Sequence, residues 1–255
     1  MKVVVCFATT PNRMVACRTM IESIVPQIET ERKAGHSIEF ECYLSLECKR
    51  ENSSILENTT LPTHLLSPPL DTIFIKEDRG PYTKLYPALE RYSNKDTIII
   101  TLDDDRIYPP ETISTLISAT KEFPLCTVGL RGRSLPISLD YNKSTKLEGP
   151  HHEIANVDIL TGAGGIAYKR SHFSSIEEEL SLWSKAIQIC PQLYYIDDIW
   201  NNGRLASRNV LRICIPGPDS ESGHIRMHAA APLSETVNRD NTNNNAGIQY
   251  FKEVW

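Results

Sequence analysis

The chain has 255 residues, of which 40% are hydrophobic, a length and composition that suit one large domain or two small ones. Its formal net charge is -5 and its lysines and arginines are dispersed, which argues against a nucleic-acid-binding surface. No apolar run is long enough for a membrane span, and the first run, Val3–Ala8, is too short for a signal peptide.

Strand-like and helical segments alternate through the first half of the sequence. The β-branched run Val3–Thr10 predicts a buried strand, and a helix is expected to start at Pro11 and Asn12, with Pro26 bending or ending it. Further strands are expected at Phe40–Leu46, Asp71–Lys76, Thr97–Leu102 and Cys126–Leu130. A helix is expected at Pro110–Phe123, and a short helix or a turn at Tyr82–Tyr92. This alternation predicts an α/β fold with a largely parallel sheet.

The pattern loosens in the second half. Residues 131–156 form a long excursion for which a hairpin is one interpretation, and residues 157–170 combine a strand-like start with a glycine-rich turn. Helices are expected at Ser175–Ile189 and Asp197–Asn209, and a strand at Val210–Pro216. The asparagine-rich residues 238–249 are expected to be flexible. No repeat or linker divides the chain, so a single domain is predicted.

Seven cysteines are present, an odd number with irregular spacing and no CxxC pair. Most lie in apolar runs, where a cysteine is typically a small buried hydrophobic residue. We therefore expect free thiols, a reducing compartment and a cytoplasmic location.

Three adjacent aspartates, Asp103, Asp104 and Asp105, follow the most hydrophobic segment of the chain. They stand too far before Pro109 to cap the next helix, so a solvated loop is the main alternative to a ligand site. They also follow a predicted central strand, and open α/β sheets bind ligands at the carboxyl ends of their strands. In an extended chain Asp103 and Asp105 point the same way, and such paired carboxylates favour a hard cation, Mg²⁺ or Mn²⁺.

Two enzyme classes place Asp-x-Asp after an apolar strand. Haloacid-dehalogenase-type phosphatases carry the motif near the N-terminus, with Thr or Val two residues beyond it, whereas here it is mid-chain and Ile107 has that position. Glycosyltransferases of the GT-A fold place it after a nucleotide-binding half of about the length found here.

Several motifs together resemble the GT-A glycosyltransferases of the DxD type, and in particular the group that includes chlorovirus capsid-glycan glycosyltransferases. In chain order they are FATTPNR, DRGPYTKL, TLDDDRIYPP, VGLRGR, DILTGAGGIAYKR and DDIWNNGRLA, and they cover residues 3–215. The resemblance implies a GT-A (Rossmann-like) fold with a mixed, mostly parallel central sheet flanked by helices. It implies one domain, residues 1–255, with a nucleotide-binding half (1–130) and an acceptor and catalytic half (131–255).

The resemblance also implies an activity: metal-dependent transfer of a sugar from a UDP- or GDP-linked donor to a hydroxyl of a glycan or glycoprotein acceptor. Mn²⁺ or Mg²⁺ would be held by Asp103, Asp105 and a late histidine, His224, with His228 as the alternative. The implied nucleotide-sugar contacts are Thr9, Arg13, Asp78, Lys84, Asp103, Asp104, Gly164, Gly165 and Asp197.

The family's catalytic base maps to Asp198, the second member of an acidic pair at a predicted helix start. A carboxylate suits this role, since it must accept the proton of an attacking sugar hydroxyl, and the stereochemistry would then invert. Its neighbour Asp197 has helix capping as an alternative role. Asp158 is the next candidate for the base. His151 and His152 could touch an acceptor, but no mechanism follows for them.

Three rival functions stay open at this point. A sugar nucleotidyltransferase usually has a glycine-rich loop with Arg and Lys after its first strand, which residues 8–13 lack. The phosphatase described above is the second rival. A carbohydrate-binding module on a degenerate GT-A fold is the third; it predicts a broken acidic set, whereas both acidic sets are intact here.

Overall fold

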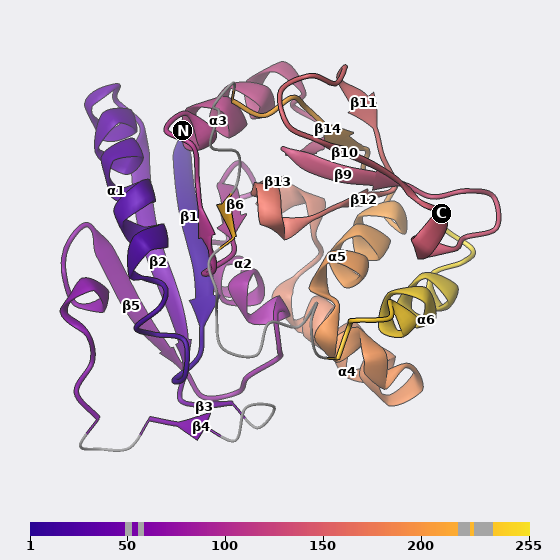
Figure 1. Ribbon diagram of the computed structural model, residues 1–255, viewed down its shortest axis with the longest axis horizontal. Helices are drawn as coiled ribbons and strands as arrows, with labels where there is room; N and C mark the ends of the chain where they lie inside the picture. Colours follow the sequence, from indigo (N-terminus) through magenta and orange to yellow (C-terminus); the bar gives the residue numbers. More distant parts are fainter. Residues whose placement is uncertain (49–52, 56–58, 219–224, 227–236) are drawn as a thin grey trace.

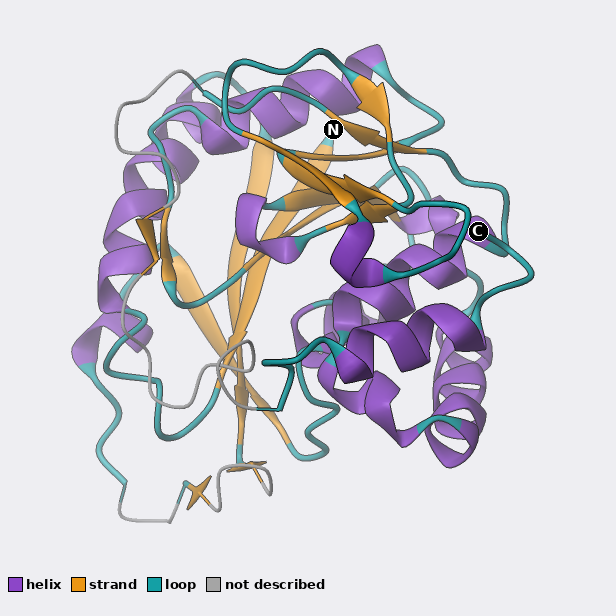
Figure 2. Ribbon diagram, turned by 45° about the vertical axis from the view of Figure 1, so that its right-hand side comes forward, coloured by secondary structure: helices purple, strands orange, loops and turns teal. Residues whose placement is uncertain are grey.

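The computed structural model describes residues 1–48, 53–55, 59–218, 225–226 and 237–255, built around one twisted central sheet (Figures 1 and 2). Eight strands form this sheet. In spatial order they are β11 (Ala155–Asn156), β14 (Arg212–Cys214), β8 (Thr127–Gly129), β13 (Ile166–Lys169), β6 (Ile98–Leu102), β1 (Lys2–Thr9), β2 (Ser37–Ser45) and β5 (Leu70–Ile75).

The half of the sheet nearest the N-terminus is parallel. Strand β1 pairs in parallel with both β2 and β6, and β5 continues the parallel run beyond β2. Strand β13 is antiparallel to both of its neighbours, β6 and β8, while β14 is parallel to β8 and antiparallel to β11. The prediction of an α/β fold with a mixed, mostly parallel sheet is therefore confirmed.

Helices cover both faces of the sheet, which explains why its central strands are apolar on both sides. Helices α1 (Arg18–Lys33) and α3 (Thr112–Glu122) pack with Val3, Val5 and Phe7 of β1 in one core. The other face of β1, with Val4 and Cys6, belongs to a second core. Four helices contribute to that second core: α2 (Tyr86–Arg91), α4 (Ile176–Ile189), α5 (Asp197–Ala206) and α6 (Thr242–Tyr250).

Helix α1 starts later than predicted, and of the two outcomes expected at Pro26, a bend or an end, the structure excludes an end. Residues 11–17 form turns, and the helix begins at Arg18 rather than near Pro11. It does not end at Pro26 but runs on to Lys33. Buried Gln27 contributes to this continuity, because its side chain donates to the carbonyl of Pro109 and accepts from the backbone N–H of Ile113. These contacts fasten the helix just beyond the proline to the start of α3.

Strand β13 lies in the centre of the sheet, although the sequence had indicated only a glycine-rich turn in this region. It is four residues long and follows Gly165, whose φ of 87° lets the chain reverse into it. Helix α5 ends at Ala206, earlier than predicted, and Asn209 adopts a positive φ just beyond it.

The asparagine-rich tail was predicted to be flexible, and this prediction is wrong. It forms helix α6, which packs against α5. A Cβ on Gly247 would lie 2.5 Å from Ile196, and Ile248 is fully buried. Beyond the helix, the ring of Phe251 lies 5.7 Å from that of Trp200. The few apolar residues of the tail therefore pack against apolar side chains of α5 and of the residue before it, Ile196.

The excursion at residues 131–156 does contain a hairpin. Strand β9 (Arg131–Ser134) pairs with β10 (Thr145–Glu148), and β12 (Ile159–Leu160) completes a small antiparallel sheet. The remaining two-stranded sheets are β3 (Glu47–Cys48) with β4 (Ser53–Ser54), and β7 (Arg106–Ile107) with β15 (Ile225–Arg226). Within the described ranges, none of the helices has the length and apolar character needed to cross a bilayer.

Candidate active site

A cavity of about 390 Å³ opens at the carboxyl ends of the parallel strands. The ends of β1 and β2 and the segment after β6 contribute to one side of it, and α5, β9 and the tail contribute to the other. The charged side chains that line it are Arg13, Asp78, Lys84, Asp103, Asp104, Asp105, Arg106, Arg131, Arg133, Asp197 and Asp198. This is the position at which open α/β sheets bind ligands.

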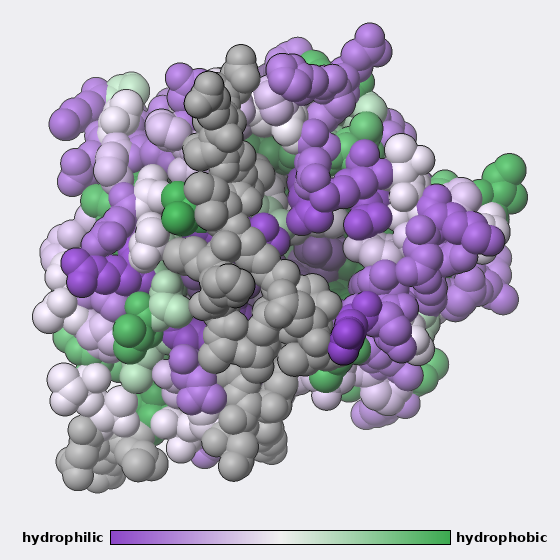
Figure 3. All heavy atoms as spheres, viewed as in Figure 1, coloured by the Kyte–Doolittle hydropathy of each residue, from purple (hydrophilic) through white to green (hydrophobic). Residues whose placement is uncertain are grey.

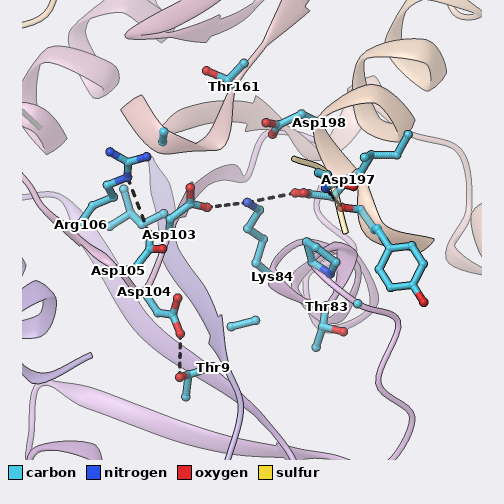
Figure 4. A pocket seen from close by; sticks show the side chains of 18 of the residues that line it. Thr9, Thr83, Lys84, Asp103, Asp104, Asp105, Arg106, Thr161, Asp197 and Asp198 are labelled. Carbon is cyan, nitrogen blue, oxygen red and sulfur yellow. Dashed lines mark hydrogen bonds and ion pairs between the residues drawn. The ribbon is translucent and has the colours of Figure 1, made fainter. Parts of the chain in front are cut away.

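The three aspartates after β6 do not continue as an extended chain, and the expectation that Asp103 and Asp105 point the same way is wrong. Residues 104 and 105 form a turn. Asp104 points back toward β1, where it accepts a hydrogen bond from Thr9 (2.8 Å) and pairs with Arg13. Asp105 shares that arginine at 3.2 Å, while Asp103 faces the opposite side of the cavity (Figure 4).

Burial and neighbouring charges separate the protonation of these carboxyl groups. Burial raises the pKa of Asp104 to about 6, although Arg13 opposes the shift. Burial would also raise the pKa of Asp103, but Lys84, together with Arg106 and Arg13, outweighs it and holds that pKa below its usual value. Two adjacent aspartates therefore differ in proton affinity because they face different cations.

Lys84 joins the two acidic motifs of the chain. Its ammonium Nζ lies 2.6 Å from Oδ1 of Asp103 and 3.0 Å from Oδ2 of Asp197, and its side chain is buried (Figure 4). Burial alone would lower the pKa of Lys84, but Asp103, Asp197 and Asp198 raise it well above its usual value. The lysine is therefore a fixed positive charge between three carboxyl groups.

Asp197 and Asp198 occupy the first turn of α5. No side chain caps this helix, so Asp197 acts through its ion pair with Lys84 and not as the N-cap that was considered for it. Asp198 accepts a hydrogen bond from the backbone N–H of Gly162 at 2.9 Å. Burial, and then the charge of Asp197, raise the pKa of Asp198 to about 7. A carboxyl group with such a pKa can exchange a proton near neutral pH.

The glycines of the TGAGG segment have different roles. Gly164 and Gly165 do not line the cavity: a Cβ on Gly164 would meet Arg131, and one on Gly165 would meet Leu116 and Leu102. Gly162 is the residue at the charged centre, since its Cβ would lie 2.6 Å from Nζ of Lys84 and 3.0 Å from Oδ1 of Asp103. Contact of Gly164 and Gly165 with a nucleotide sugar stays a prediction, and the close backbone approach at the charged centre is made by Gly162, which like them is not a lining residue.

Asp78 lines the cavity but is engaged in local structure. Its Oδ1 accepts from the backbone of Gly80 at 3.1 Å and from Thr83 at 3.2 Å. Its Oδ2 accepts from the hydroxyl of Tyr194 at 3.2 Å. The turn that leads to Lys84 is therefore fastened to the segment that precedes Asp197, and the two motifs are held together at two points.

Several lining residues were not found from the sequence. They are Arg106, Arg131, Arg133, Tyr141, Thr161, Tyr195, Asn238, Asn241 and Asn244. The three asparagines belong to the tail taken to be flexible. Arg131 and Arg133 stand two apart on β9, and that alternation was the available signal that both face one side of a strand.

The histidine predictions have separate outcomes. His224 and His228 lie outside the described residues. His151 and His152 do not line the cavity, and neither does Asp158, whose Oδ2 accepts from the backbone of Leu135. Among the residues that the structure describes, no three His, Cys, Asp or Glu side chains form a group that could hold a metal ion by themselves.

Comparison with known proteins supports the fold and goes no further. No protein-family model and no curated protein sequence matches this chain. The structure is similar to a solved structure of 4-diphosphocytidyl-2C-methyl-D-erythritol synthase, with a TM-score of 0.50 and 9% identity, over 93% of this chain and 95% of that chain. At this identity the likeness establishes a GT-A/nucleotidyltransferase-like fold alone.

Proposed function

We propose that this chain is a metal-dependent glycosyltransferase that moves a sugar from a nucleotide-diphosphate sugar to an acceptor hydroxyl, with inversion. The observation that carries the proposal is the meeting of two acidic motifs in one cavity. Lys84 contacts Asp103 on one side and Asp197 on the other, and Asp198 lies next to them. A group that binds the donor's diphosphate and a group that accepts the proton of the acceptor hydroxyl can then act together in one site.

The donor set near Asp103 fits a hard divalent cation. Its ligands would be carboxylate oxygens of Asp103 and of Asp105, which would first have to turn away from Arg13 and Arg106. Mg²⁺ typically uses one or two carboxylates together with substrate phosphates and water. The side chain of Asp103 is 27% exposed, so one face is open to the cavity. When bound, Mn²⁺ or Mg²⁺ would supply positive charge that stabilises the departing diphosphate. His224 stays a proposed further ligand.

Asp198 is the proposed general base. Its raised pKa, about 7, gives it useful affinity for a proton at neutral pH, and its Oδ1 is oriented by the N–H of Gly162. The acceptor hydroxyl would lose its proton to this carboxylate as its oxygen attacks the anomeric carbon. Attack from the face opposite the leaving diphosphate inverts the configuration.

The donor-binding role is shared among the residues on the sheet side of the cavity. Lys84 is placed to exchange Asp103 for a phosphate oxygen, and Thr9 and Arg13 hold Asp104 in the position from which it orients the turn. Asp78 would support the nucleotide end indirectly, through the turn that it stabilises. In this proposal Gly162 takes over the close-approach role first given to Gly164 and Gly165.

A sugar nucleotidyltransferase remains the second candidate, because the fold is shared with that class. One observation weighs against it. Arg13, the basic residue of the segment after β1, is engaged by Asp104 and Asp105, whereas a nucleotidyltransferase needs cations there for a triphosphate. The phosphatase and the non-catalytic binding module are disfavoured by the second acidic pair, which neither function requires.

The decisive experiment is a screen of UDP- and GDP-linked sugars with Mn²⁺ and a mixture of glycan and glycoprotein acceptors. We expect release of nucleoside diphosphate and a glycoside of inverted configuration by NMR. Release of pyrophosphate from a nucleoside triphosphate and a sugar phosphate would instead support the nucleotidyltransferase.

Free thiols at Cys6, Cys17, Cys42, Cys126, Cys190 and Cys214 are compatible with the proposed cytoplasmic location.

A further inference from the structure

Five cationic side chains line the cavity within the described ranges, and they fall into two groups. Arg13, Lys84 and Arg106 lie within 4 Å of carboxylates on the segment after β6 or at the start of α5. Arg131 and Arg133 lie on β9, on the side of the cavity formed by the hairpin and the tail. Residues two apart on a strand face the same side, so the two guanidinium groups form a pair.

The internal contacts of this pair leave much of its hydrogen-bonding capacity for a ligand. Nε of Arg131 lies 2.9 Å from Oε2 of Glu148, a side chain that is 46% exposed, so water screens this ion pair. Arg133 donates Nη1 to Ser144, and its guanidinium stacks over Tyr141 at 4.6 Å. Among the described atoms, Nε of each arginine is buried without a hydrogen bond of good geometry. A guanidinium has five N–H donors, and these contacts use few of them.

The surroundings of the pair suit a sugar. Tyr141 offers a ring, and its backbone N–H donates to Asn245, which joins the hairpin to α6. The amides of Asn142, Asn241 and Asn244 form a hydrogen-bonded chain beside it. Amide groups and an aromatic face are typical partners for hydroxyls and for the apolar face of a sugar ring. Hydrophilic side chains also gather over β9, β10 and α6 on the surface in Figure 3.

The position of the pair relative to the other charges identifies which substrate it would meet. The backbone N–H of Thr161 donates to the carbonyl of Arg131 at 2.9 Å, and the N–H of the next residue, Gly162, donates to Asp198 at 2.9 Å. Burial chiefly raises the pKa of Tyr141; Asp198 adds to the shift, while Arg133 and Arg131 oppose it. The pair therefore lies on a strand joined to the segment that orients the proposed base. The cations that contact the aspartates of the proposed diphosphate site are instead Arg13, Lys84 and Arg106.

We infer that Arg131 and Arg133 form a subsite for an anionic group, a carboxylate or a phosphate, on the acceptor sugar. Two planar guanidinium groups on one strand match the paired oxygens of such an anion. An anion held there would fix the acceptor so that one of its hydroxyls reaches Asp198. This inference rests on the proposed glycosyltransferase function and adds to it the charge class of the acceptor.

The test uses the full chain loaded with UDP or GDP and Mg²⁺, so that the diphosphate site is filled. Methyl glycosides of glucose, galactose and mannose are titrated beside their 6-carboxylate and 6-phosphate forms, with affinity read by ligand-observed NMR. For at least one sugar, we expect the 6-carboxylate or 6-phosphate glycoside to bind roughly tenfold more tightly than its neutral form. This gain is typical of charge-assisted hydrogen bonds. The carboxylate and phosphate arms identify which anion is preferred.

Variants connect this preference to the arginine pair. Arg131→Gln with Arg133→Gln should remove it and leave nucleotide affinity within about twofold, since the diphosphate is held elsewhere. Lys146→Gln is the matched control, because Lys146 is a cation of the same hairpin that does not line the cavity. Should the double variant fail to fold, the single variants and the wild-type preference still decide the question.

Three outcomes would overturn the inference: equal affinity for charged and neutral glycosides, no binding of any charged glycoside at tens of millimolar, or loss of nucleotide binding in the double variant. The last outcome would move the arginines to the donor side. Absence of metal-dependent nucleotide binding in the wild-type protein would instead reject the proposed function itself.

Discussion

The ammonium group of Lys84 lies 2.6 Å from Oδ1 of Asp103, and both side chains line the same cavity. The same nitrogen lies 3.0 Å from Asp197, so one buried lysine forms ion pairs with an aspartate from each of two motifs that are 94 residues apart. Removing either aspartate therefore changes the electrostatic environment of the other, because both contact the same ammonium group.

Nucleotide-diphosphate binding should require a divalent cation. Asp105→Asn should remove most of the metal-dependent affinity, because an amide replaces a charged oxygen ligand. Calorimetry with UDP or GDP, in Mn²⁺ and in EDTA, measures this directly. Asp96→Asn, the same change at an exposed residue that does not line the cavity, serves as the control. Equal affinity with and without metal in the wild-type protein would contradict the prediction.

Asp198→Asn should separate donor binding from chemistry. The substitution keeps size and shape but cannot accept a proton at neutral pH, so single-turnover transfer should fall by about 10²–10⁴-fold while donor affinity survives. Near wild-type transfer by this variant would show that the base lies elsewhere, and Asp197 would then be tested next, because Asp158 does not line the cavity.

Asp197→Asn should have a different effect from its neighbour's substitution. The sequence had suggested a loss through helix capping, but the structure gives Asp197 an ion pair with Lys84 and no capping role. Its loss leaves Lys84 with Asp103 alone, and we expect a decrease of about 1–3 kcal/mol in the free energy of unfolding. Chemical denaturation measures the decrease. A fully inactive, normally stable Asp197→Asn variant would instead reverse the roles assigned to the pair.

Transfer should increase as the pH rises through about 7. Asp198 has a raised pKa of about 7, so it is mostly protonated and inactive as a base below that pH and mostly ionised above it. The charge of Asp197 contributes to that rise, so Asp197→Asn should move the inflection to lower pH. The pH profile of kcat/KM tests both statements, and an inflection that does not move would remove Asp197 as a cause.

Gly162→Ala should impair donor binding without unfolding the protein. The new Cβ would stand 2.6 Å from Nζ of Lys84 and 3.0 Å from Oδ1 of Asp103, which are the far ends of side chains and can shift. We expect donor affinity to fall by roughly tenfold, because the ion pair is displaced. Gly217→Ala is the matched control, since its Cβ would meet nothing closer than 3.8 Å. Equal donor affinity in the two variants would contradict the role given to Gly162.

The sequence predicted best those elements whose signal is local. Residues Thr97–Leu102 are apolar and β-branched, and β6 lies where this pattern placed it, with its five residues buried. Strand β13 was missed because four residues after a glycine turn carry too little periodicity to distinguish a strand from a loop. Helix α6 was missed because its stability comes from the surface of α5, which no local pattern of asparagines reports.

The candidate site was predicted in its residue types more than in its geometry. Asp103, Asp197 and Asp198 do line one cavity, as the order of the motifs implied. The turn at residues 104 and 105 could not be foreseen, because it is fixed by Arg13, which reaches back from the end of the first strand. Side-chain direction at such a point depends on tertiary partners, and these are set by the fold as a whole.

Helix α6 limits how far the expressed chain can be shortened from its C-terminus. The recognisable motifs end near residue 215, and a gene shortened to that point would encode α5 without the ring of Phe251 that lies 5.7 Å from Trp200. A Cβ on Gly203 would lie 2.4 Å from that ring, so the glycine in α5 is what allows the ring of Phe251 to pack against the helix. Without the tail, the apolar surface of α5 that Phe251 and Gly247 cover would be exposed to water, and exposed apolar surface favours aggregation during expression. Chimaeras with proteins of the same fold should therefore exchange α5 and the last nineteen described residues, 237–255, together.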